Sequence, residues 1–205
     1  MIHTRLFTSS VILIVSLMGE MAVAAETMSA GQAYVGIEGG LLAMNNFDPA
    51  VPGVNKTGFS VGATALLRAG WQWRDHVRID GQIGWSGANI DDLAGQIDLA
   101  YATANVYWDF STPGAWVRPY LGAGLGVAGG WLSTNVPAAT GPLARRSGVG
   151  LAYLFAGGGR FPLNDRWTLA CAYQFLGTAA LIDDGSGSVI NPTMHAFMVG
   201  IHRSF

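Results

Sequence analysis

The stretch HAFMVGIHRSF, residues 195–205, alternates between two sets of side chains. Phe197, Val199 and Ile201 form an apolar odd-numbered set, whereas the even-numbered set includes Gly200 and His202. A repeat of two is that of a β-strand, because successive side chains point to opposite faces. The pattern predicts a strand that crosses a membrane as part of a closed barrel, with the odd-numbered set toward lipid and the even-numbered set toward the lumen.

The same alternation recurs through the chain and predicts eight strands, each with an apolar outward face and a small or polar inward face. The expected strands cover residues 32–42, 58–72, 77–87, 96–110, 118–131, 148–161, 167–175 and 195–205. The connections near residues 74, 112 and 164 are short. Long connections rich in Gly, Pro, Asn, Asp and Ser are expected at 43–57, 88–95, 132–147 and 179–191. Short turns are typical of the periplasmic side and long loops of the outside, so the sequence predicts an all-β, eight-stranded antiparallel up-and-down transmembrane β-barrel.

The first 25 residues read as a secretory signal peptide. Arg5 precedes an apolar run from Leu6 to Met18, and the small residues Ala22 to Ala25 follow it. A positive start, a short hydrophobic segment and a small-residue cleavage site define such a signal. We therefore expect residues 1–25 to be removed after export and residues 26–205 to form one outer-membrane domain.

Composition excludes several other classes of protein. Half of the chain is hydrophobic and 12% is charged, yet no apolar run after the signal reaches the roughly 20 residues of a membrane-spanning helix. The net charge of -2 gives no reason to expect a nucleic-acid partner, and the single cysteine, Cys171, excludes an internal disulfide. A soluble up-and-down barrel is the alternative, but its core would be left empty by the glycines of the inward face.

Three segments carry a resemblance to a known family: PYLGAGLGVAGG at 119–130, ATANVYWDF at 102–110 and LACAYQFLGT at 169–178. With the aromatic end at Phe205, they resemble the small outer-membrane β-barrel proteins of Gram-negative bacteria, the OmpA-like transmembrane superfamily and its stand-alone surface antigens. The resemblance implies fold and location rather than an activity. The expected partners are outer-membrane lipid, lipopolysaccharide and the barrel-assembly machinery, with Phe205 as the C-terminal assembly signal.

Charged residues at inward positions are the main candidates for a site. They are Glu38, Arg68, Arg78, Asp80, Asp109 and Arg160. An eight-stranded barrel is too narrow to keep three acids and three bases apart, and unpaired buried charge is costly, so we expect a paired network. Either a static plug of ion pairs or a gate that opens when partners are exchanged is consistent with this pattern.

Catalytic and metal sites are not expected. The histidines of the mature chain are His76, His195 and His202, and they do not share a face. Candidate nucleophiles near extracellular strand ends are Ser86, Ser147 and Ser186, which His195, Asp183 and Asp184 could assist. Such residues are common in loops without catalysis, so we expect no enzyme activity and no cofactor.

The sequence favours a structural protein of the envelope that is exposed at the cell surface. A narrow porin-like channel through the charged lumen and an adhesin acting through the long loops are the alternatives. Arg145 and Arg146 could hold lipopolysaccharide phosphates, and an extracellular ligand could bind the loops.

Overall fold

The computed structural model describes residues 30–45, 61–90, 95–110, 115–134, 145–179, 182–183 and 189–205. Its barrel strands are β1 (Ala33–Met44), β2 (Gly62–Arg74), β3 (Val77–Ile90), β4 (Gly95–Asp109), β5 (Arg118–Thr134), β6 (Arg145–Pro162), β7 (Trp167–Ala179) and β10 (Thr193–Ser204). The short strands β8 (Ile182–Asp183) and β9 (Val189–Ile190) form a separate two-stranded sheet. Within these residues no helix is long and apolar enough to cross a membrane.

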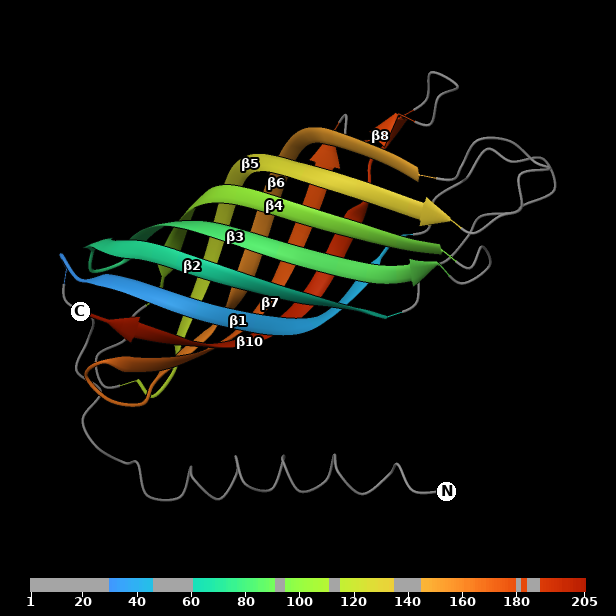
Figure 1. Cartoon of the computed structure of the whole chain (residues 1–205). Coiled ribbons are helices and arrows are strands. Elements are labelled where there is room, and N and C mark those ends of the chain that lie inside the picture. The colour runs from blue at the N-terminus through green and yellow to red at the C-terminus, as the bar shows by residue number, and fades with distance from the viewer. Residues whose placement is uncertain are drawn as a thin grey trace, which may run out of the picture.

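The eight long strands close into one antiparallel barrel in which each strand pairs with its neighbour along the chain. The first and last long strands, β1 and β10, complete the circle in a register that runs from Tyr34 opposite Ser204 to Met44 opposite Met194. Beyond β10, the Phe205 amide donates to the Ala33 carbonyl over 3.0 Å. The predicted eight-stranded up-and-down barrel is therefore confirmed, and Figure 1 shows it from the side.

One end of the barrel carries the C-terminus, the start of β1 and the short turns between β2 and β3 and between β6 and β7 (Figure 1). Short turns mark the periplasmic side of bacterial barrels, so we assign this end to the periplasm. The opposite end is then extracellular. The predicted signal peptide, residues 1–25, lies outside the described residues.

Several strands run further into the extracellular side than their sequence predicts. Strands β5 and β6 stay paired as far as Ser133 and Arg145, and Gly95 of β4 pairs with Thr134. The Arg145–Arg146 pair thus belongs to a strand rather than to a loop, which corrects the expected loop 132–147. Loop-forming residues mislead here because Gly, Ser and Thr donate and accept backbone hydrogen bonds as well as other residues do. The expected loop 179–191 likewise contains the β8–β9 pairing.

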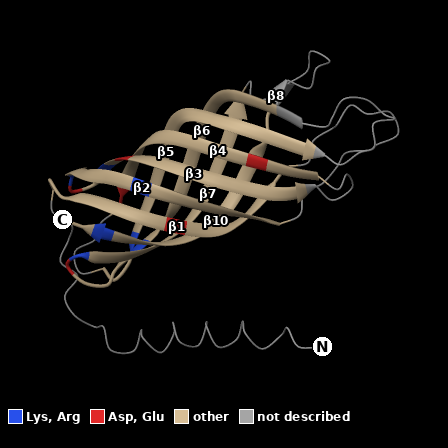
Figure 2. Cartoon of the chain, in the orientation of Figure 1, with Lys and Arg blue, Asp and Glu red and all other residues tan. Residues whose placement is uncertain are grey.

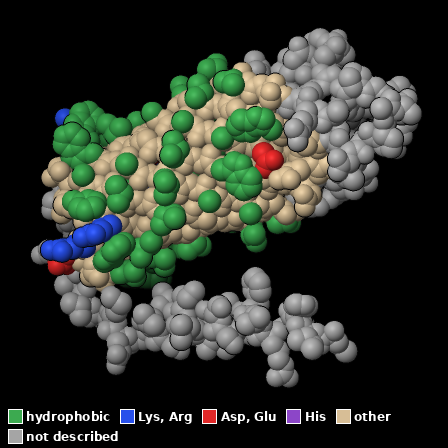
Figure 3. Space-filling model, viewed as in Figure 1, with side chains coloured by type: hydrophobic (Ala, Val, Ile, Leu, Met, Phe, Trp, Pro, Cys, Tyr) green, Lys and Arg blue, Asp and Glu red, His purple; other side chains and the backbone are tan. Residues whose placement is uncertain are grey.

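The outer wall is apolar and carries two belts of aromatic residues. Exposed aromatics near the periplasmic end are Trp71, Trp73, Trp108, Phe110, Trp116, Trp167 and Phe205. Those toward the other end include Trp85 and Trp131. Along β4, ten residues separate Trp108 from Asp98, the partner of Trp131, and a rise of about 3.3 Å at a tilt of about 40° gives a height of about 25 Å. This is the height of a lipid-facing band, and Figure 3 shows hydrophobic side chains spread over the visible wall.

The interior has two different halves. Toward the periplasm it holds charged and polar side chains, including all six charged residues expected there. Toward the extracellular end it holds an apolar cluster. In this cluster Leu99, Leu154 and Met194 are 0% exposed and Leu66 is 3% exposed. The expectation of a small or polar inward face throughout is therefore wrong for this half. Leucines stand at inward positions because here side chains fill the lumen as they fill a protein core.

Candidate functional site

The periplasmic half of the lumen brings the six predicted charged residues together. Glu38 comes from β1, Arg68 from β2, Arg78 and Asp80 from β3, Asp109 from β4 and Arg160 from β6, all at positions where strand alternation points the side chain inward. Each is 4% exposed or less. In Figure 2 most charged residues of the coloured barrel lie toward the end that carries the C-terminus.

Arg68 is the centre of a first group of charges. Its Nε donates to Glu38 Oε1 and its Nη1 to Asp80 Oδ2, both over 2.9 Å. Glu38 Oε1 also accepts from His202 Nε2 over 2.8 Å, and Asp80 Oδ1 accepts from Asn105 Nδ2 over 2.8 Å. Two carboxylates and one guanidinium thus meet in a buried site, where each carboxylate accepts from a second donor.

Asp109 is the centre of a second group. Arg78 Nε donates to both of its carboxylate oxygens, over 3.2 and 3.0 Å, and Arg160 Nη1 donates to Oδ2 over 3.3 Å. One acid therefore serves two arginines. The Arg78 guanidinium also lies over the rings of Tyr107 and Tyr120, 4.7 and 5.0 Å from their centroids, which provides further stabilisation for the buried cation.

Tyr34 joins the two groups. Its hydroxyl donates to Asp80 Oδ2 over 2.6 Å and accepts from Arg78 Nη1 over 3.0 Å. Tyr107 plays a similar part, since its hydroxyl accepts from Arg68 Nη1 over 2.5 Å. The interior charges therefore form one continuous network that spans β1 to β6 and β10.

The network includes residues that the sequence analysis did not assign to it. Tyr34, Tyr107 and His202 stand at inward positions of their strands, and this alternation was the signal that could have found them. Arg118 adds a fourth buried arginine; it lines a small polar pocket at the periplasmic mouth together with Arg160 and Asp165. Among the described residues, four arginines inside the barrel thus face three acids.

Each buried carboxylate of the network has several hydrogen-bond donors. Carboxylate oxygens of Glu38, Asp80 and Asp109 each accept at least two charged or polar donors. Removing one partner would leave an uncompensated charge in a site where rehydration is hindered, which costs several kcal/mol. For these side chains to exchange partners, more than one of the contacts would have to break at once.

Ser86, Ser147 and His195, the residues considered for catalysis whose side chains the structure describes, lie apart from one another. Ser86 is fully buried inside the barrel and donates to Thr64 Oγ1 over 2.8 Å, so it has no access to a substrate. Ser147 lies on β6 opposite Trp131, and His195 Nδ1 shares a 2.6 Å hydrogen bond with the Tyr173 hydroxyl on the outer face. Asp184 and Ser186 lie outside the described residues, as does the side chain of Asp183.

The histidines are likewise apart from one another. His76 contacts the Asp109 carbonyl at the β2–β3 turn over 3.2 Å, and His202 belongs to the interior network. In the described ranges no three His, Cys, Asp or Glu side chains are arranged to hold a metal ion.

Comparison with known proteins supports the same class. The model of the outer membrane protein beta-barrel domain matches residues 11–205. Among curated proteins, no sequence matches the chain. Three solved structures share the fold: Neisserial surface protein A (NspA; 16% identity, 84% of this chain and 97% of that chain, TM-score 0.59), Ail of Yersinia pestis with a heparin analogue (16%, 86% and 99%, 0.54) and OprG of Pseudomonas aeruginosa (13%, 86% and 97%, 0.51).

These identities are too low to transfer a specific role, but the family match covers nearly the whole chain and agrees with the closed barrel and its two aromatic belts. The chain belongs to the outer membrane protein beta-barrel family and resides in the cell outer membrane.

Proposed function

We propose that the protein is a structural, non-enzymatic barrel that supports the integrity of the outer membrane, carries its loops to the cell surface and does not conduct. The burial of the lumen is the observation that supports this role. Leu99, Leu154 and Met194 are 0% exposed in the extracellular half, and Arg78 and Asp109 are 1% and 2% exposed in the other half. A water-filled pore would leave its lining side chains exposed to solvent. Lipopolysaccharide, membrane lipid and the barrel-assembly machinery are the partners we propose for this role.

The first prediction concerns conductance. The refolded full chain in a planar bilayer is expected to show no discrete openings, because apolar side chains fill one half of the lumen and paired charges fill the other. The Arg68→Ala variant is expected to be equally silent, since the apolar half stays closed. A large porin in the same bilayer serves as the positive control. Openings in the wild type that Arg68→Ala alters would overturn the proposal in favour of a narrow porin-like channel.

An adhesin is the second candidate, supported by the likeness to Ail, which is named as an attachment invasion locus protein and has been solved with the heparin analogue sucrose octasulfate. Arg145 and Arg146 lie at the extracellular end of β6, paired with Ser133 and Leu132. If the chain binds sulfated polysaccharide, the doublet would contribute charge-assisted hydrogen bonds to sulfate.

The adhesin role predicts that the refolded barrel binds a heparin-coated surface and that the double variant Arg145→Gln/Arg146→Gln binds at least fivefold more weakly. Arg166→Gln, at the periplasmic end, is the matched control because it removes an arginine from the opposite rim. Binding that is absent in the wild type, or that both variants weaken equally, would contradict an extracellular polyanion site.

A further inference from the structure

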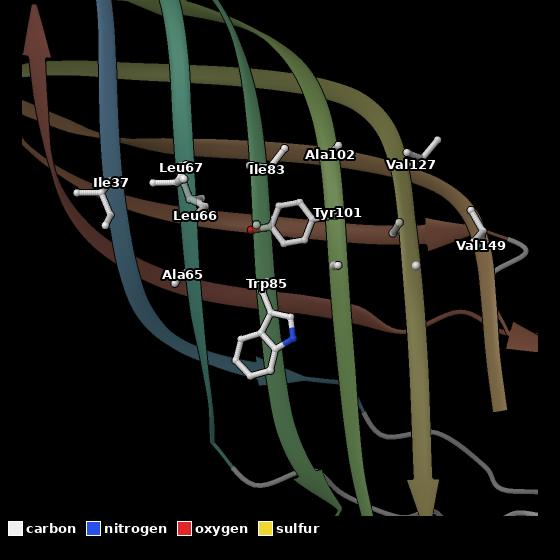
Figure 4. A pocket seen from close by; sticks show the side chains of 14 residues that line it. Ile37, Ala65, Leu66, Leu67, Ile83, Trp85, Tyr101, Ala102, Val127 and Val149 are labelled. Carbon is white, nitrogen blue, oxygen red and sulfur yellow. The ribbon is translucent and has the colours of Figure 1, made fainter. Parts of the chain in front are cut away.

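A long apolar groove crosses the outer wall of the barrel. It consists of two adjoining hollows of about 1010 and 640 Å³. They share the side chains of Ile37, Leu67, Ile83, Ala102 and Val127, which follow one another across β1 to β5. Figure 4 shows this row, with Trp85 further toward the extracellular end of β3.

Small residues create the groove. In the neighbouring register row, Ala69 of β2 lies opposite Gly81 of β3, which lies opposite Ala104 of β4. A Cβ built on Gly81 would meet no atom closer than the Thr103 carbonyl oxygen at 4.0 Å, so the space above this glycine is open. Larger outward side chains flank this row on both sides, Leu67 opposite Ile83 in one neighbouring row and Trp71 opposite Ile79 in the other. The hollow is therefore a local feature of the lipid-facing surface.

A cation stands at the periplasmic mouth of the groove. Arg203 lines it together with Trp167 and Phe205, and its guanidinium carbon lies 5.7 and 5.2 Å from the centroids of these two rings. The described residues place no carboxylate within ion-pair distance of Arg203. The other outward side chains that line this hollow are apolar or are glycines. An arginine held against aromatic rings at a membrane interface is suited to a phosphate, which accepts two parallel hydrogen bonds from a guanidinium.

The groove climbs through the thickness of about one lipid leaflet. A continuous register row leads from Arg203 through Val35, Ala69, Gly81 and Ala104 to Leu125. Five strand spacings of about 4.8 Å give a path of about 24 Å. Because strands of such barrels tilt by about 40°, this row climbs by about 15 Å, which is half of the roughly 30 Å hydrocarbon core.

We propose that this groove binds one phospholipid of the periplasmic leaflet, with the phosphate at Arg203 and an acyl chain along the row from Val35 to Leu125. The periplasmic leaflet is proposed because the cation lies at the periplasmic end, where that leaflet has its phosphates. An acyl chain is proposed because the floor of the groove is apolar. The inference rests on the membrane location and the groove, and it is independent of whether the lumen conducts.

Native mass spectrometry of the refolded full chain in mixed micelles with phosphatidylglycerol tests the proposal. The wild type is expected to retain one phosphatidylglycerol. Arg203→Gln removes the cation and Gly81→Leu fills the floor; each is expected to reduce the lipid-bound fraction at least fivefold. Two matched controls are expected to stay within twofold of the wild type. Arg74→Gln removes a periplasmic arginine whose guanidinium lies 5.4 Å from the Trp73 ring, and Ala123→Leu enlarges an outward residue outside the groove.

Circular dichroism of each variant shows whether the barrel has folded. The two groove variants change different parts of the site, so one folded variant is enough to test the proposal. Retention of lipid at wild-type level in a folded groove variant would overturn the proposal. Equal loss in the controls would also overturn it, by showing that the whole belt holds lipid without preference. A dimer that Gly81→Leu abolishes would assign the groove to a second copy of the chain instead.

Discussion

Replacing Asp109 with alanine is expected to lower the free energy of unfolding by about 3–5 kcal/mol. Asp109 is the carboxylate shared by Arg78 and Arg160, and both arginines are buried beside it. Its removal leaves two cations in the same enclosed space without their shared partner. Urea unfolding of the chain in phospholipid vesicles, followed by tryptophan fluorescence, measures the loss. Asp109→Asn, which keeps an acceptor oxygen but not the charge, is expected to lie between the wild type and the alanine variant.

Asp98 is the matched control for this prediction. It is partly exposed and lies on the same strand, where its Oδ1 accepts a hydrogen bond from Gln96 over 3.0 Å. Asp98→Ala is expected to change stability by about 0.5 kcal/mol or less, as at most surface positions. If Asp109→Ala proves as mild as Asp98→Ala, then Arg78 and Arg160 are hydrated in the folded barrel and the interior is not a closed network.

Leu99→Ala is expected to lower the free energy of unfolding by about 2–5 kcal/mol. Leu99 points into the lumen, is 0% exposed and packs in the apolar cluster of the extracellular half. Its truncation leaves a cavity that neighbouring side chains fill only in part. In a water-filled lumen the same change would be neutral or stabilising, because it would remove apolar surface from water. The same unfolding experiment therefore distinguishes a packed interior from an open one.

Leu121→Ala provides the comparison, because Leu121 is 59% exposed on the lipid-facing wall. Lipid chains are about as apolar as leucine and can move into the space that the truncation creates, so we expect a clearly smaller loss than for Leu99→Ala. Equal losses at the two positions would contradict the distinction between a packed interior and a fluid exterior.

Strand alternation explains how much of the fold the sequence could predict. Phe197, Val199, His202 and Ser204 lie on the expected faces of β10, and the same pattern places Glu38 and the other charged residues inside. The two-residue repeat depends only on strand geometry, so it is present whatever the side chains contact. The number of barrel strands and the inward position of the charged residues could therefore be predicted without a structure.

The pairing inside the barrel could not be read in this way. Alternation says which side chains point inward but not at what height, and height depends on the register between strands. Arg78 contacts Asp109 because the β3–β4 register places Asp109 two residues beyond Tyr107, the partner of Arg78. Tyr34 meets both groups from β1. The apolar half escaped prediction for another reason. Where leucines occupy both faces, as at Leu66 and Leu67, the contrast between inward and outward positions disappears.

The join between β1 and β10 has a consequence for biogenesis. Tyr34 and Ser204, which lie opposite each other there, are separated by almost the entire domain, and closing a loop of that length costs on the order of 4–5 kcal/mol of chain entropy. Until that join forms, both strands are open edges, which lipid does not tolerate. The Glu38–His202 contact spans it, so the first and last strands of the barrel also meet in one buried hydrogen bond. Insertion should therefore be all-or-none: a chain that has lost its final strand has no partly closed form in which to persist, and it is left to periplasmic chaperones and proteases.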